Sequence, residues 1–94
     1  MNDMMRIFAN WPAAIPTVAT VVTTAGETIP FNDYMLTDEL VLLIRPQPDA
    51  SGTRRVIMKL SDIAALRIID AIEPERFTAM GFQKHIDAAV RRPH

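Results

Sequence analysis

The segment 56–70 constrains the fold of this chain more than any other stretch. It contains most of two apolar runs, 54–60 and 63–69, which are rich in Val, Ile, Leu and Met. Runs of this length and composition are typical of strands. The polar pair Ser61-Asp62 leaves room for only a one-turn interruption between them. Small five-stranded barrels close with an arrangement of this kind, and we therefore expect an all-β small barrel.

The rest of the chain supplies three more strands and a helix at each end. Residues 17–24 are dense in β-branched side chains, 27–36 form the returning strand after a turn at Gly26, and 40–44 are apolar on both faces. The strand 40–44 therefore has either both faces covered or one face against another subunit. We expect a short N-terminal helix, a single domain over 1–94 with its barrel core at about 17–70, and a C-terminal helical extension over 74–92.

The amino-acid composition restricts the cellular compartment and the class of protein that we expect. Ninety-four residues, 49% of them hydrophobic, suit one packed domain. The absence of cysteine excludes disulfides and thiolate metal sites and fits a cytoplasmic location. The uncharged run 7–26 is long enough to span a membrane, but it contains Pro12, Pro16 and four threonines. We therefore expect neither a membrane span nor a secretory signal.

Charge is distributed unevenly along the chain. Residues 1–44 contain one base, Arg6, and five acids, whereas residues 45–94 contain nine bases and six acids. Asymmetry of this sort is found on nucleic-acid surfaces and also in proteins that bind none. The charge pattern therefore leaves the partner open.

Catalytic and metal-binding patterns are missing from the sequence. Ser51 and Ser61 have no Ser/His/Asp arrangement around them, and the glycines are isolated. His85 and His94 are the only imidazoles, and neither has a second ligand at suitable spacing. The only candidate acid–base groups for a hydrolase or isomerase are the carboxylates of the acidic turn near Asp38. We therefore predict a protein that is not an enzyme and holds no metal or cofactor.

Two segments resemble motifs of the Sm/LSm/Hfq-like proteins. Asp38-Glu39 followed by the aliphatic run 40–44 is similar to the family's turn and third strand. Residues 58–63 are similar to its second motif, a strand that ends in a basic residue before a tight turn and an isoleucine. The likeness covers about 18–69, with Lys59-Leu60 standing where the bacterial proteins have Lys-His.

This resemblance implies a fold, an assembly and a ligand. The fold would be a five-stranded SH3/Sm-like barrel, and the assembly a cyclic homo-oligomer of roughly five to seven subunits. In it the fourth strand of one subunit pairs with the fifth strand of the next. The ligand would be RNA or another single-stranded nucleic acid. Lys59 would contact phosphate near Ser61 and Asp38, and Tyr34 would lie close to a base.

A second hypothesis is a protein–protein interaction adaptor with an SH3-like barrel and no nucleic-acid binding. Its contact surfaces would be the aliphatic strand and the C-terminal helix. The two hypotheses predict different surfaces. RNA binding predicts a positive patch centred on Lys59 with Arg54, Arg55 or Arg67, whereas an adaptor predicts an exposed apolar patch.

Overall fold

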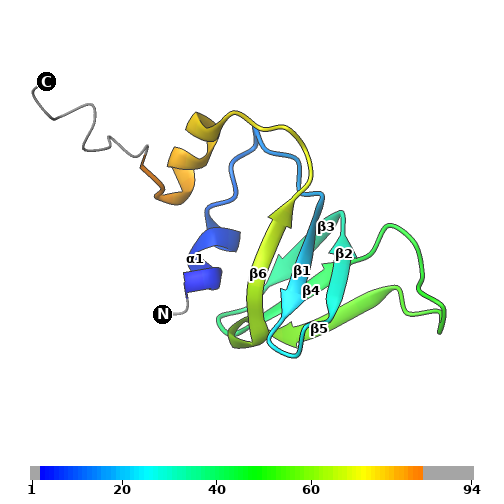
Figure 1. Cartoon of the computed structure of the whole chain (residues 1–94). Coiled ribbons are helices and arrows are strands. Elements are labelled where there is room, and N and C mark those ends of the chain that lie inside the picture. The colour runs from blue at the N-terminus through cyan, green and yellow to red at the C-terminus, as the bar shows by residue number, and fades with distance from the viewer. Residues whose placement is uncertain (1–2, 84–94) are drawn as a thin grey trace, which may run out of the picture.

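The computed structural model describes residues 3–83 and contains two small antiparallel sheets with short helices beside them (Figure 1). The described chain begins with a helix, continues through six strands and ends after a 3-10 helix. The elements are α1 Asp3–Ala9, β1 Ala19–Thr23, β2 Thr28–Phe31, β3 Asp33–Leu36, β4 Leu40–Ile44, β5 Arg55–Lys59, η1 Leu60–Asp62, β6 Ile63–Ile68 and η2 Pro74–Met80.

Each sheet has three strands. The first has the order β2-β1-β6 and the second the order β3-β4-β5. Every neighbouring pair is antiparallel, with Val21 opposite both Ile29 and Leu66 in the first sheet. In the second sheet, Leu42 lies opposite both Met35 and Ile57. The turn η1 carries the chain directly from β5 in one sheet to β6 in the other.

The predicted closed five-stranded barrel is wrong. The single strand expected over 27–36 is divided at Asn32 into β2 and β3, which belong to different sheets. At this point the amide of Asn32 donates to the carbonyl of Ile44, and its own carbonyl accepts from the hydroxyl of Thr17. Among the described strands, β5 pairs only with β4 and β6 only with β1, so neither sheet closes.

The predicted C-terminal helix over 74–92 is also wrong. Residues 74–80 form the short 3-10 helix η2, with Pro74 at its start. The helix stops because Gly81 adopts a left-handed conformation with φ of 101°, which glycine tolerates without steric cost. The remainder of the predicted extension, 84–92, lies outside the described residues.

Side-chain alternation divides each strand between the core and the surface. In β4, Val41 and Leu43 are fully buried, whereas Leu40 retains 37% exposure. Successive residues of a strand point to opposite faces, so Val41 and Leu43 define the inner face of the β3–β4–β5 sheet. The buried apolar side chains are Phe8, Ile15, Ala19, Val21, Ile29, Phe31, Val41, Leu43, Leu60, Ile63 and Met80.

An aromatic cluster joins α1 to both sheets. Phe8 on α1 lies 4.8 Å from Tyr34 on β3 and 6.1 Å from Phe31 on β2, measured between ring centroids. Trp11 stacks on Phe8 at 5.8 Å, and its indole nitrogen donates to the carbonyl of Ile15. Edge-to-face and offset pairs of this kind add to the burial of the rings themselves. The helix therefore covers the place where β2 and β3 separate.

We expect Phe8→Ala to destabilise the protein by about 3–5 kcal/mol, because it removes a 2%-exposed ring from the centre of this cluster. Urea denaturation followed by Trp11 fluorescence measures the change. Arg6→Ala, on the same helix but exposed, is the control. A loss equal to that of the control would show that α1 does not hold the core together.

Candidate functional site

Lys59 and Ser61 lie on an exposed turn where β5 ends and η1 begins. Between them Leu60 is 1% exposed, and its amide donates to the carbonyl of Glu39 over 2.9 Å. This bond fixes η1 against the turn between β3 and β4. As a result Lys59 and Ser61 share a pocket with Glu39 and Leu40. The predicted juxtaposition of Lys59 and Ser61 is therefore present.

Acidic residues lie in the turn that contains Lys59 and Ser61 and in the β3–β4 turn bonded to it. Asp38 and Glu39 occupy the β3–β4 turn, which the hydroxyl of Thr37 holds by accepting from the amides of Glu39 and Leu40. Asp62 follows Ser61 in η1. All three carboxylates and the lysine are on exposed residues. One cation among three carboxylates creates no positive field at this turn.

Tyr34 lies on the opposite face of the sheet from Lys59. Tyr34 pairs with Leu43 and Lys59 pairs with Leu40, and these two β4 residues point to opposite faces. The Tyr34 hydroxyl donates to the carbonyl of Phe8 over 2.6 Å, with its ring inside the aromatic cluster. The structure therefore does not bring Tyr34 to the other predicted site residues.

The arginines named in the nucleic-acid hypothesis do not gather at Lys59. Arg55 begins β5, about 13 Å of strand away from Lys59 at its end, and Arg54 precedes the strand and lies farther away. Arg67 belongs to β6 in the other sheet. In residues 3–83 the positive patch that RNA binding predicts is therefore absent around Lys59.

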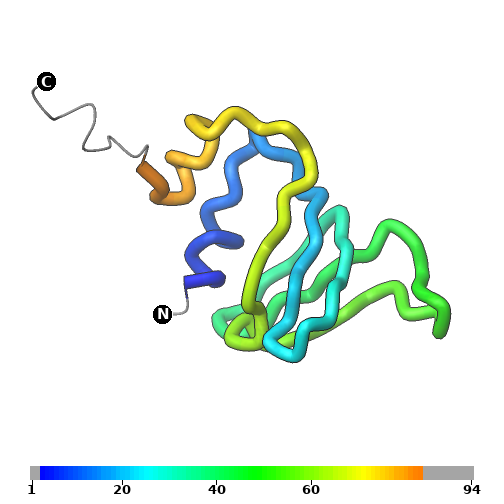
Figure 2. Tube along the Cα trace, viewed as in Figure 1, coloured from blue at the N-terminus to red at the C-terminus, as the bar shows by residue number. Residues whose placement is uncertain are grey.

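The loop between β4 and β5 extends away from both sheets (Figure 2). The carboxylate of Asp49 accepts hydrogen bonds from the hydroxyl and amide of Ser51 and from the amide of Thr53. These bonds, with the Ser51 hydroxyl first, lower the pKa of Asp49. Asp49 thus gives the loop a defined turn, and its acceptor oxygen is engaged within the loop.

Apolar side chains lie exposed on the outer face of the β3–β4–β5 sheet. Met35 and Ile57 are 64% and 65% exposed, on either side of Leu42. They belong to a groove of about 270 Å³ lined by Met35, Leu36, Thr37, Leu40, Leu42 and Ile57. The apolar character of 40–44 on both faces predicted either two covered faces or one face against another subunit. That prediction did not extend to the exposed Met35 and Ile57 on the neighbouring strands.

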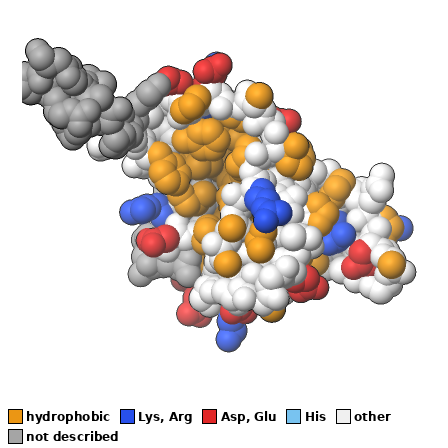
Figure 3. Space-filling model, viewed as in Figure 1, with side chains coloured by type: hydrophobic (Ala, Val, Ile, Leu, Met, Phe, Trp, Pro, Cys, Tyr) orange, Lys and Arg blue, Asp and Glu red, His pale blue; other side chains and the backbone are white. Residues whose placement is uncertain are grey.

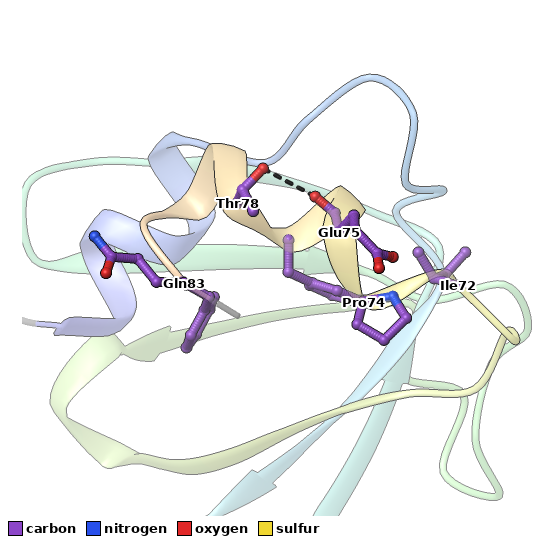
Figure 4. A pocket seen from close by; sticks show the side chains of 7 residues that line it. Ile72, Pro74, Glu75, Thr78 and Gln83 are labelled. Carbon is purple, nitrogen blue, oxygen red and sulfur yellow. Dashed lines mark hydrogen bonds between the residues drawn. The ribbon is translucent and has the colours of Figure 1, made fainter. Parts of the chain in front are cut away.

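A second apolar surface lies where α1, β6 and η2 meet (Figure 3). Phe82, which lines this surface, is 54% exposed. A neighbouring pocket of about 360 Å³ follows η2, and Figure 4 shows the Thr78 hydroxyl donating to the carbonyl of Glu75 at its rim. The pocket is lined mainly by apolar atoms, and no cluster of ligating side chains within 3–83 is suited to a metal.

Comparisons with protein-family models, with curated proteins and with solved structures found no match to this chain. The Sm/LSm/Hfq-like resemblance therefore remains a prediction from sequence. None of the helices in the described part of the chain has the length and apolar character needed to cross a bilayer.

The burial of Tyr34 and its hydrogen bond to the Phe8 carbonyl predict a loss of stability at alkaline pH. Burial raises the pKa of Tyr34, and the nearby Asp33 carboxylate raises it further. The stability that neutral Tyr34 contributes is complete below its ordinary pKa of about 10 and is lost as pH rises through the raised pKa. We expect Tyr34→Phe to cost about 0.5–1.5 kcal/mol at neutral pH and to remove this alkaline loss.

Urea denaturation of both proteins over a series of alkaline pH values measures the effect. Tyr34 is the only tyrosine in the chain, so tyrosinate absorbance follows its titration without interference. Equal stability losses in the wild type and in Tyr34→Phe would show that another group is responsible.

Proposed function

We propose that this protein is a non-enzymatic assembly module that associates with further copies of itself through two open strand edges. The observation that supports this most directly is the position of β5 and β6. Each strand ends a sheet and has one partner among the described strands. The two edges contain no proline, and open edges of this kind are templates for another strand.

Charge at the ends of the two strands favours pairing β5 of one copy with β6 of the next. Arg54 precedes β5 and Lys59 ends it, whereas Asp62 precedes β6 and Asp70 follows it shortly. In an antiparallel arrangement Arg54 approaches Asp70, and Lys59 approaches Asp62. Exposed ion pairs contribute little free energy, but they select the direction and partner of a strand.

This contact is heterologous, because the two copies contribute different edges. Each copy then has β5 for one neighbour and β6 for the other. Repetition closes into a ring when the rotation between copies divides a full turn, and otherwise continues as a filament. We propose a ring, the assembly that the Sm/LSm/Hfq-like resemblance implies, because closure pairs the β5 edge and the β6 edge of every copy.

We expect the wild-type protein to have the discrete mass of an oligomer in light scattering on a sizing column. Asp62→Lys/Asp70→Lys places like charges opposite Lys59 and Arg54 and should shift the mass to smaller species. Glu27→Lys/Glu73→Lys changes the net charge equally on exposed residues elsewhere and is the control. Amide hydrogen exchange should slow at alternate residues of β5 and β6 on assembly. A wild-type monomer at every concentration would overturn the proposal.

A second candidate function is binding of single-stranded nucleic acid by the assembled copies. The specific observation in its favour is the exposed pair Lys59 and Ser61 on one turn. A single such site is weak, but identical sites repeated around an assembly add their contacts to one strand. The neighbouring carboxylates of Asp38 and Glu39 oppose this binding, which is why it stands second.

Titration of a labelled single-stranded oligonucleotide at two salt concentrations tests this candidate. We expect Lys59→Ala to weaken binding and to reduce the salt slope by about one for each phosphate that the lysine no longer neutralises. Arg76→Ala, an exposed arginine on η2, is the control. Binding that ignores both salt and Lys59→Ala would favour the protein-adaptor hypothesis instead.

A further inference from the structure

The outer face of the β3–β4–β5 sheet has a regular arrangement of side chains. The register places Asp33, Ile44 and Arg55 in one row and Met35, Leu42 and Ile57 in the next. The third row pairs Leu40 with Lys59. Paired residues of antiparallel strands share a face, so these side chains lie together, opposite the buried Val41 and Leu43.

The middle row gives this face an apolar centre. Met35 and Ile57 retain almost two thirds of their accessible surface, although they flank a half-buried leucine. Isolated exposed apolar residues are ordinary, whereas a contiguous groove with charged residues at its margin indicates an interaction surface. The charges here are of both signs: Asp33 lies on one outer strand, and Arg55 and Lys59 lie on the other.

We propose that a second copy of this chain packs face to face on this surface, about a two-fold axis that runs along β4. Such an axis places β3 of one copy over β5 of the other. Asp33 then faces Arg55 of the partner subunit, and Met35 faces Ile57 of the partner subunit. Each contact occurs twice, and the two copies of Leu42 meet near the axis.

Charge complementarity selects this occupant. Asp33 and Arg55 have the same cross-strand partner, Ile44, so the axis brings opposite charges together. Lys59 comes over the end of the partner's β3, near Thr37 of the partner subunit, where no cation lies. A nucleic-acid strand would instead meet the carboxylate of Asp33. An acidic peptide would meet the same repulsion.

The dimensions of the face set the strength of the contact. Its outer strands are about 10 Å apart, and Arg55 and Lys59 are separated by about 13 Å. A face of this size is smaller than the roughly 800 Å² that each partner buries in a standard interface. We therefore expect a weak, reversible dimer, as is typical of interfaces below the standard size. This dimer does not use the backbone edges of β5 and β6, so both edges stay available for the edge pairing.

A charge-swap cycle in sedimentation equilibrium tests the proposal on the full chain. Asp33→Arg and Arg55→Asp should each weaken face-to-face association by about tenfold or more, because each opposes like charges on both sides of the axis. The double variant should return to within about threefold of the wild type. Arg76→Asp is the matched control and should change nothing. Failure of the double variant to recover would overturn the proposal.

Two further variants separate this contact from the edge pairing and from misfolding. In Asp62→Lys/Asp70→Lys, which weakens the edges, the dimer should persist. A monomer of that variant up to the highest measurable concentration would overturn the face-to-face dimer. Ile57→Glu should abolish the dimer while the circular dichroism and urea midpoint stay near wild type, since Ile57 is 65% exposed. A folded Ile57→Glu protein that still dimerises would also overturn it.

Discussion

The aromatic cluster of Phe8, Trp11, Phe31 and Tyr34 is the contact on which the rest of the structure depends. Phe31 belongs to one sheet and Tyr34 to the other, and Phe8 reaches both from α1. The two three-stranded sheets do not close and share few backbone hydrogen bonds. Packing between their side chains must therefore hold the two sheets in position relative to each other. The 2.6 Å bond from the Tyr34 hydroxyl to the Phe8 carbonyl adds a directional constraint to that packing.

Local patterns predicted the elements more successfully than their pairing. The turn at η1 and the strands β4, β5 and β6 follow from short apolar runs and the polar Ser61-Asp62 pair. The division at Asn32 did not follow, because residues 27–36 look like one strand when read alone. The chain changes sheets there because of two hydrogen bonds of Asn32, one to Ile44 and one from Thr17. Both partners are distant from Asn32 in the sequence, so a local pattern does not reveal the bonds.

In the candidate site, too, the local pattern predicted what lies close in the sequence but not what the strand pairing brings together. Lys59 and Ser61 lie together because only Leu60 separates them along one turn, so the sequence alone shows that they are neighbours. Tyr34 was placed with them by resemblance, yet strand alternation points it into the core, where Phe8 and Phe31 cover it. Of the apolar outer face, only the part on β4 was predicted from the sequence. Its exposed centre depends on the register of Met35 and Ile57 with Leu42, which composition alone does not specify.

Strand β5 offers two independent surfaces to other molecules. Its edge presents backbone hydrogen-bonding groups in the plane of the sheet, whereas Arg55, Ile57 and Lys59 present side chains perpendicular to that plane. A strand added at the edge would therefore extend the sheet without covering Ile57, and a copy stacked on the face would leave the edge open. If both contacts form, one chain has a contact that repeats around a ring and another that joins pairs across a two-fold axis. Combining the two gives a closed double ring of dihedral type if the two-fold axis crosses the ring axis at a right angle.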